Sequence, residues 1–276
     1  MRRSWLVRLR AQPNATARLV CVPYAGGGAS AYQAWSGDLP DVEVWAAELP
    51  GRERRFAEPA ATSIDEVVEP LADAITAQVR PPWVLFGHSM GGLVAWRLAE
   101  LLYRRATGDT ASLENPGKAG RAQVAAVGST PAAPACLFLS GTRPPNLPAA
   151  AGTHDFDDAS LLAWLSELGG LPAEVVEDRQ LVELILPTIR ADLKLCDTFD
   201  RASIIPLPVP LVAFAGTADP LATVDEVAAW HRYAAGGFRL VRVPGDHFFL
   251  HQHRRQVTHV IGEWLRARPS GPRPGG

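Results

Sequence analysis

Short apolar runs rich in β-branched and aromatic residues recur along the chain, separated by stretches with helical periodicity. Seven such runs lie at 5–9, 18–22, 42–49, 83–86, 135–139, 210–216 and 238–243. Between most of them the sequence favours helices, most clearly over 64–79, where the apolar residues fall on one helical face. Strands that alternate with helices predict an α/β fold, in which helices cover both faces of a mostly parallel sheet.

Two stretches interrupt this alternation. Residues 106–123 are polar and rich in small side chains, which predicts a mobile surface insertion. Residues 141–204 contain helical segments but no strand-like run, and they are too long for a simple crossover. Because they fall between two core strands, we expect a helical lid, with plain core packing as the alternative. We expect 1–266 to form a single domain and 267–276, which lacks large apolar side chains, to be a disordered tail.

Composition and charge argue against several classes of protein. Apolar residues make up 47% of the chain and charged residues 20%, which is usual for a globular protein. The net charge of −2 offers no field for nucleic acid. No stretch approaches the roughly 18 apolar residues of a membrane span, and Arg8 and Arg10 interrupt the apolar segment that a signal peptide needs. The 3 cysteines cannot pair completely, so we expect reduced thiols and a cytoplasmic protein.

A serine flanked by glycines stands where one apolar run breaks. The sequence GHSMG (87–91) follows the run WVLF and precedes GGLVAWRLAELLYRR, which favours a helix. The G-x-S-x-G pattern alone is weak evidence. A strand-to-helix bend, however, is the position of a nucleophile elbow, where glycines avoid clashes and the helix dipole points at the serine oxygen. We therefore predict that Ser89 is a nucleophile, with a tight turn and an incidental serine as the alternative.

A serine nucleophile needs a base, and the base needs an acid that orients it. In a hydrolase of this kind the chain order is Ser, then Asp or Glu, then His. His247 is the histidine that directly follows a strand-like run, although it could also be a solvated loop residue. Asp219 lies three residues beyond Gly216, past another strand end. Asp246 and Asp225 are rivals, but the first would point away from its neighbour His247 and the second lies in a predicted helix.

The reaction also needs two backbone N–H groups that stabilise an oxyanion. One comes from the residue after the nucleophile, Met90, and the other from an early loop. The sequence RLVCVPYAGGGAS supplies that loop, with Ala25 as the expected donor and glycines at 26–28 that allow the substrate to approach. A phosphate-binding loop is the alternative, but the stretch lacks the lysine of a P-loop.

These features together resemble the type II thioesterases of polyketide and nonribosomal peptide biosynthesis, which have the α/β-hydrolase fold. The resemblance covers nearly the whole chain through the motifs CVPYAGGGASAYQAW, ELPGRERRFAEP, FGHSMGGLVAW, FLSGTRPP, LGGLP, LPTIRADLKLCDTF, GTADP and GDHFFL. The triad of this family would fall on Ser89, Asp219 and His247, and its oxyanion positions on Ala25 and Met90. Residues 106–123 look longer than is usual in the family.

The resemblance implies an enzyme that removes unwanted acyl groups from the phosphopantetheine arm of carrier proteins. It implies no metal and no bound cofactor, because phosphopantetheine arrives as part of the substrate. Three other functions remain open: a carboxylesterase acting on small free esters, a product-releasing thioesterase or cyclase, and a hydrolase fold kept only for binding. The intact triad argues against the last.

Three arginines in PGRERRF lie just past the end of a strand-like run. Arg52, Arg54 and Arg55 are therefore expected on the edge of the sheet that carries the triad. Because carrier proteins are typically acidic, this cluster is a candidate docking site that steers a loaded carrier toward Ser89. A solvated charged loop is the alternative.

Overall fold

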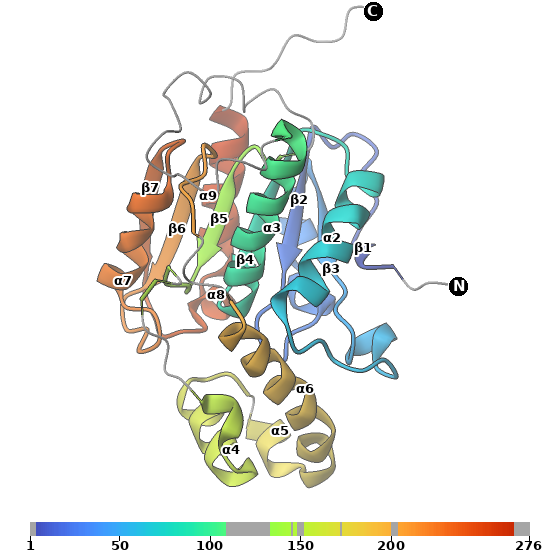
Figure 1. The fold of residues 1–276 in the computed structure, drawn as a ribbon, viewed down its shortest axis with the longest axis vertical. Helices are drawn as coiled ribbons and strands as arrows, with labels where there is room; N and C mark the ends of the chain where they lie inside the picture. The colour runs from blue at the N-terminus through green and yellow to red at the C-terminus, as the bar shows by residue number, and fades with distance from the viewer. Residues whose placement is uncertain are drawn as a thin grey trace, which may run out of the picture.

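A seven-stranded sheet forms the centre of the described structure (Figure 1). The computed structural model describes residues 4–108, 133–144, 146–147, 152–171, 173–199 and 204–267. Within them the strands are β1 (Leu6–Arg8), β2 (Ala17–Val22), β3 (Val42–Ala47), β4 (Trp83–His88), β5 (Leu137–Ser140), β6 (Leu211–Gly216) and β7 (Phe238–Val243). Each predicted run overlaps one of these strands.

The order of the strands is β1-β3-β2-β4-β5-β6-β7. Neighbouring strands pair in parallel from β3 through to β7, and β1 pairs antiparallel with β3. The carboxyl ends of the six parallel strands therefore meet at one edge of the sheet. In open parallel sheets this edge is where ligands bind.

Helices cover both faces of the sheet, as the alternating pattern predicts. The described helices are α1 (Trp35–Asp38), α2 (Ile64–Gln78), α3 (Met90–Thr107), α4 (Asp158–Glu167), α5 (Ala173–Glu177), α6 (Arg179–Asp197), α7 (Val224–Ala228), α8 (Phe249–Gln252) and α9 (Arg254–Ala267). Figure 1 shows α2 and α3 in front of the sheet and α9 behind it. This arrangement confirms the predicted α/β-hydrolase architecture.

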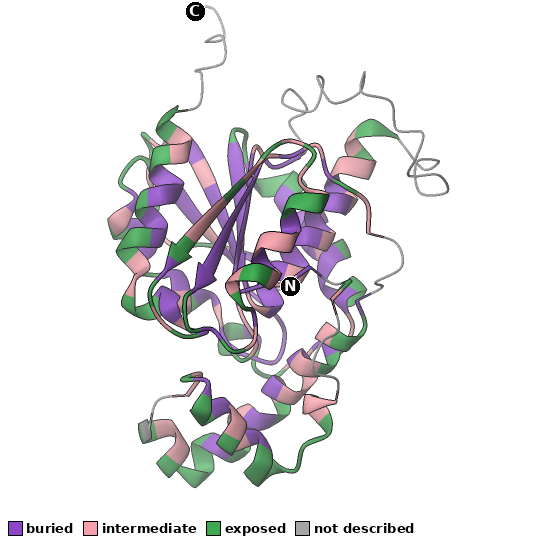
Figure 2. Cartoon of the chain, turned by 90° about the vertical axis from the view of Figure 1, so that its left-hand side faces the viewer, coloured by how far each residue is buried: buried purple, intermediate pink, exposed green. Residues whose placement is uncertain are grey.

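Successive residues of the strands pack into two different cores. In β2, Val20 and Val22 join the core formed with α2 and α3, whereas Leu19 and Cys21 join the core formed with α1 and α9. The side chains of a strand point alternately to its two faces, so a strand covered on both sides is apolar at every position. Figure 2 shows the strands mostly buried.

The described part of 141–204 is helical and contains no strand, as expected. It includes α4, α5 and α6, which lie beyond the carboxyl edge of the sheet in Figure 1. These helices have a small core of their own, made by Leu161, Leu165, Val182, Leu186 and Ile189. We call this segment the lid.

Several expectations fall wholly or partly outside the described residues. Of the predicted insertion at 106–123, only 106–108 are described, and they end α3. The predicted tail is described only at its first residue, Ala267, where α9 ends. Within the described ranges, no helix is both long enough and apolar enough to cross a membrane.

Candidate active site

Ser89 occupies the bend between β4 and α3. Its backbone has φ 54° and ψ −121°, a conformation that is strained for a residue with a side chain. A Cβ atom at Gly87 would lie 2.0 Å from the carbonyl oxygen of Gly91, and one at Gly91 would lie 2.2 Å from that of Val22. Both glycines of the motif are therefore required by close backbone contacts, and the bend has the geometry of a nucleophile elbow.

The serine hydroxyl is the first member of a hydrogen-bonded chain. His247 Nε2 lies 2.9 Å from Ser89 Oγ, and His247 Nδ1 lies 2.9 Å from Asp219 Oδ2. The other carboxylate oxygen of Asp219 accepts the backbone N–H groups of Leu221 and Ala222 at 2.8 and 3.0 Å. Asp219 and His247 are only 4% and 2% exposed. The structure thus brings the three predicted residues together as a triad, with the carboxylate fixed on both oxygens.

The rival acids do not occupy this position. Asp246 is exposed, and its Oδ1 accepts the backbone N–H of Phe248 at 2.9 Å. Asp225 is exposed in the first turn of α7. His88, the residue before the nucleophile, is buried and its Nδ1 lies 2.9 Å from Ser140 Oγ. The His88 ring packs beside that of His247, with the centroids 5.1 Å apart, but His88 is not part of the hydrogen-bonded chain of the triad.

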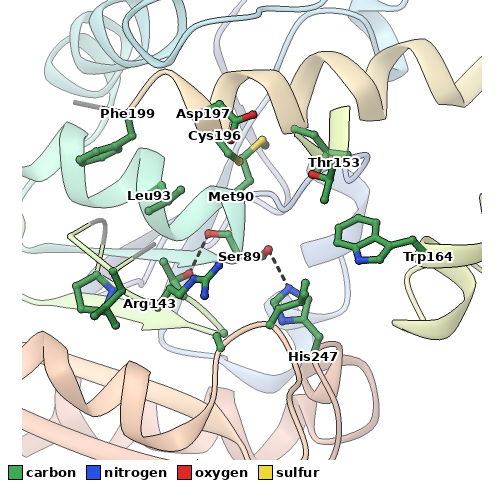
Figure 3. Close-up of a pocket in the computed structure, with 17 residues that line it drawn as sticks. Ser89, Met90, Leu93, Arg143, Thr153, Trp164, Cys196, Asp197, Phe199 and His247 are labelled. Carbon is green, nitrogen blue, oxygen red and sulfur yellow. Dashed lines mark hydrogen bonds between the residues drawn. The ribbon is translucent and has the colours of Figure 1, made fainter. Parts of the chain in front are cut away.

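A cavity of about 150 Å³ opens beside Ser89 (Figure 3). The triad side of its lining is formed by Ser89, Met90 and His247. Apolar side chains also line the cavity, among them Leu93 from α3 and, from the lid, Trp164 on α4 and Leu193 on α6. Figure 3 shows Trp164 approaching the cavity from α4. The apolar wall and the polar triad suit a substrate with a hydrocarbon chain and a reactive carbonyl.

A thiol also lines this cavity. Cys196 on α6 lies among the lining residues, but desolvation, reinforced by the charges of Asp192 and Asp197, raises its pKa well above the usual value. The thiol therefore stays protonated at neutral pH and is a poor nucleophile. Ser89, with its hydrogen-bonded histidine, is the activated group.

The two expected oxyanion donors lie on neighbouring segments. Met90 is the first residue of α3 and lines the cavity, and the N–H of a first helical residue has no partner within its helix. Ala25 lies in the loop after β2 and is not among the lining residues. That loop begins against the start of α3, because a Cβ at Gly91 would lie 2.6 Å from the carbonyl oxygen of Pro23.

The three arginines do not form the expected exposed cluster. Arg52 and Arg55 are buried, with 7% and 5% of their surface exposed. Arg55 pairs with Glu58 and donates to the carbonyl oxygen of Glu48. Arg54, in contrast, has 63% of its side chain exposed, and it pairs with the buried Glu48. All three guanidinium groups are therefore in internal ion pairs, and among them only Arg54 is exposed enough to contact a carrier protein.

Sequence reasoning missed two polar residues at this site. Thr142 Oγ1 lies 2.9 Å from the carbonyl oxygens of both Ser89 and Ser140 and so anchors the bend. Asp192 on α6 forms a bidentate pair with Arg52. Asp192 could have been noticed, because it lies on the same helical face as the buried Ile189 and Leu195. A carboxylate on an apolar face requires a buried partner.

The fold and the triad define a serine hydrolase of the α/β-hydrolase class. The family profile described as "Thioesterase domain" matches residues 17–112 and 125–265. The chain therefore belongs to the thioesterase family, and it is a thioester hydrolase.

Two curated relatives match over most of their length. The gramicidin S biosynthesis protein GrsT of Aneurinibacillus migulanus is 31% identical over 95% of this chain and 94% of its own. Thioesterase PikA5 of Streptomyces venezuelae is 32% identical over 97% and 88%.

Solved structures of thioesterases are also similar to this chain. RedJ, a thioesterase from the prodiginine biosynthetic pathway in Streptomyces coelicolor, is 33% identical with a TM-score of 0.78, over 92% of each chain. The type II thioesterase BorB from the borrelidin biosynthetic cluster is 32% identical with a TM-score of 0.78, over 95% of this chain and 98% of its own.

Proposed function

We propose that this thioesterase hydrolyses acyl groups, especially aberrant or stalled ones, from the phosphopantetheine arm of carrier proteins in polyketide or nonribosomal peptide synthesis. The observation that carries the proposal is the triad opening into an apolar cavity beneath a helical lid. The pathway follows from the relatives, whose names place them in gramicidin S, prodiginine and borrelidin biosynthesis. The partner is then an acyl or peptidyl carrier domain of a modular synthase.

The triad geometry supports a two-step reaction. Ser89 Oγ attacks the thioester carbonyl while His247 Nε2 takes its proton, and Asp219 holds the imidazole through Nδ1. Collapse of the tetrahedral intermediate breaks the C–S bond, and His247 returns the proton to the pantetheine sulfur. A water molecule, deprotonated by His247, then attacks the acyl-serine ester. The second collapse releases the free acid and restores the Ser89 hydroxyl.

The negative oxygen that forms in each step needs hydrogen-bond donors. We assign the N–H groups of Met90 and Ala25 to this role. Met90 begins α3, so the positive end of the helix dipole adds to its effect. Each donor of this kind is worth about 10²- to 10³-fold in kcat in other serine hydrolases.

The free cysteines support a reducing compartment for the enzyme. Cys21, Cys136 and Cys196 are all free thiols in the structure, and burial raises the pKa of Cys21. Free buried thiols are typical of the cytoplasm, where we expect the enzyme to meet its carrier proteins.

The proposal is tested by comparing three substrates with one acyl group: an acyl-carrier thioester, the matching pantetheine thioester and a matching oxygen ester. We expect the highest kcat/KM for the carrier thioester. A higher value for the oxygen ester would favour a carboxylesterase instead. Strong preference for one long chain, with cyclised product, would favour product release.

The nucleophile is tested on the same substrates. We expect Ser89→Ala to stay folded and lose nearly all hydrolysis, and a fluorophosphonate probe to label Ser89 in the wild type. The matched control is Ser166→Ala, which removes an exposed hydroxyl from the lid helix α4. A fluorophosphonate adduct on any other serine would refute the assignment.

A further inference from the structure

Asp192 is a buried carboxylate outside the triad. Only 1% of its surface is exposed, although it belongs to the lid helix α6. Its Oδ2 accepts the backbone N–H of Gly26 at 2.7 Å. Arg52 donates to both oxygens, from Nη1 at 2.7 Å and from Nη2 at 2.6 Å. One carboxylate thus joins the lid, the loop after β2 and the loop after β3.

Arg52 adds a second contact to the same loop. Its Nη1 also donates to the carbonyl oxygen of Gly27 at 3.0 Å. The pair therefore holds the N–H of the Ala25–Gly26 peptide and the C=O of the Gly27–Gly28 peptide, which fixes the orientation of both peptide units. Two independent hydrogen bonds on one short segment specify its conformation more narrowly than either alone.

The backbone at Gly26 and Gly27 needs contacts from other parts of the chain to hold one conformation. Gly26 has φ +75°, in the left-handed region that favours glycine, and glycine has more conformations to lose than any other residue. A Cβ on Gly26 would lie 2.8 Å from Ile189 Cγ1 on α6, so the lid helix packs directly on this peptide. The residue before it is Ala25, the assigned oxyanion donor.

A buried ion pair of this kind is weak evidence for stability. Removing two charges from water costs nearly as much as their attraction returns, and apolar replacements are often equally stable. The Arg52–Asp192 pair is better explained by the conformation that it imposes on the backbone of Gly26 and Gly27.

We propose that Asp192, together with Arg52, is a positioning residue that holds the loop after β2 in the conformation that directs Ala25 N–H at the oxyanion. The inference rests on the proposed catalytic role of Ala25. It assigns the lid helix a second task besides lining the cavity: α6 supplies the acceptor that orders the oxyanion loop.

The test separates stability from catalysis with two variants. Arg52→Met combined with Asp192→Leu removes both charges and leaves Gly26 N–H without its acceptor. We expect a melting temperature modestly below that of the wild type, because Gly26 N–H loses its acceptor. We expect a kcat about 10- to 100-fold lower, because a displaced donor no longer meets the oxyanion. Asp192→Asn keeps an acceptor oxygen for the N–H of Gly26 but leaves the buried charge of Arg52 without a counter-charge. We expect a lower melting temperature with most of the kcat retained.

A second measurement reports on the oxyanion site itself. An alkyl boronic acid forms a tetrahedral adduct with Ser89 whose oxygen occupies the oxyanion position. Its affinity should fall in the double variant by the same factor as kcat/KM, measured with a short acyl-pantetheine thioester. KM should change little, because the cavity walls are intact. A merely structural role would not produce this correlation.

The matched control is Thr188→Val. Thr188 Oγ1 on the same helix donates to the carbonyl oxygen of Gly51 at 3.0 Å, so this variant loses a contact between lid and core but leaves Gly26 held. It should keep both kcat and boronate affinity. The proposal is overturned if the double variant behaves like this control, or if its kcat falls while boronate affinity does not. Failure of the proposed function would instead appear in the wild type, as a higher kcat/KM for the oxygen ester than for the carrier thioester.

Discussion

At Ser89 the reactive oxygen and a strained backbone conformation come from the same bend. The positive φ persists because β4 and α3 are both buried, and because the N–H of Ser89 donates to the carbonyl oxygen of Ser140 at 2.9 Å. Thr142 holds the carbonyl oxygen of the same residue. A residue that is fixed on both sides of its Cα cannot relax, so its hydroxyl stays directed at His247.

At the residue scale, the contact between Asp219 and His247 predicts how kcat changes when the carboxylate is replaced by an amide. Replacing it by Asn keeps the shape, but the amide can present N–H to Nδ1 and favour the wrong imidazole tautomer. We expect Asp219→Asn to lower kcat by about 10³- to 10⁴-fold, as in other serine hydrolases. Steady-state kinetics on an acyl-pantetheine thioester measures the effect. Asp246→Asn is the control, because Asp246 is exposed and its carboxylate accepts the N–H of Phe248 in its own loop. A larger loss there would reverse the assignment.

The buried His88 predicts how the free energy of unfolding depends on pH. Burial, with repulsion from His247 and His251, holds the pKa of His88 well below its usual value of 6.5. The unfolded chain therefore binds a proton below about pH 6.5 that the folded chain does not bind. The free energy of unfolding should decrease as pH falls below that value.

Urea unfolding between pH 7.5 and 5.5 measures this dependence. We expect His88→Asn, whose amide can still bond Ser140 Oγ, to show a flatter slope than the wild type. His259→Gln, at an exposed position on α9, should keep the wild-type slope. Equal slopes in the wild type and His88→Asn would show that His88 is not responsible.

At the scale of elements, the two faces of the lid helix α4 have different tasks. Leu161 and Leu165 are buried in the core of the lid, whereas Trp164, which precedes Leu165, packs against this core and also lines the cavity. The sequence predicted a helix here but left open whether its apolar residues pack or line the acyl channel. The structure shows that they do both, because neighbouring positions point to different sides of the helix.

The position of Trp164 in the cavity wall therefore predicts an effect on acyl chain-length preference. Trp164→Ala removes a cavity wall, so we expect the ratio of kcat/KM for long over short acyl thioesters to rise about tenfold. Trp164→Phe should have a smaller effect, since it retains a ring. Leu165→Ala should instead cost about 2–5 kcal/mol of stability and leave the ratio unchanged. An unchanged ratio in Trp164→Ala, with a lower melting temperature, would mean that the ring only packs.

The sequence predicted the strands well because a strand buried on both faces is continuously apolar and stands out from its neighbours. It also predicted which loops follow the strands that carry Ser89, Asp219 and His247. It failed at Arg52 and Arg55. The ion-pair partner of Arg52 lies 140 residues away on α6, and Arg55 stacks on the ring of Trp5 near the start of the chain. No local pattern contains that information.

At the scale of the whole molecule, the site is assembled at one edge of the sheet. Segments following β2, β4, β5, β6 and β7 all contribute, because parallel strands bring their carboxyl ends together. The lid closes over this edge and, through Asp192, contacts the loops after β2 and β3. A single domain spanning 1–266, with the lid inserted at 141–204, remains our prediction for the whole chain.

Docking of a carrier protein is a property of the whole surface. Arg54 is the exposed member of the three arginines, in the short helical turn Glu53–Arg55 beyond β3. If it steers an acidic carrier toward Ser89, acyl-carrier thioesters should have a higher kcat/KM than pantetheine thioesters, and this advantage should shrink as salt rises. Exposed charges are screened beyond about 10 Å at 0.1 M salt.

Variants of Arg54 test this directly. Arg54→Gln removes the charge but keeps a donor for Glu48, and we expect it to reduce the carrier advantage about two- to fivefold at low salt, as for one exposed charge pair. Arg54→Lys keeps the charge and should keep the advantage. Both should cleave pantetheine thioesters at the wild-type rate, because neither touches the cavity. If Arg54→Gln and Arg54→Lys retain the same salt-dependent advantage, the carrier docks elsewhere and Arg54 serves only to neutralise the buried Glu48.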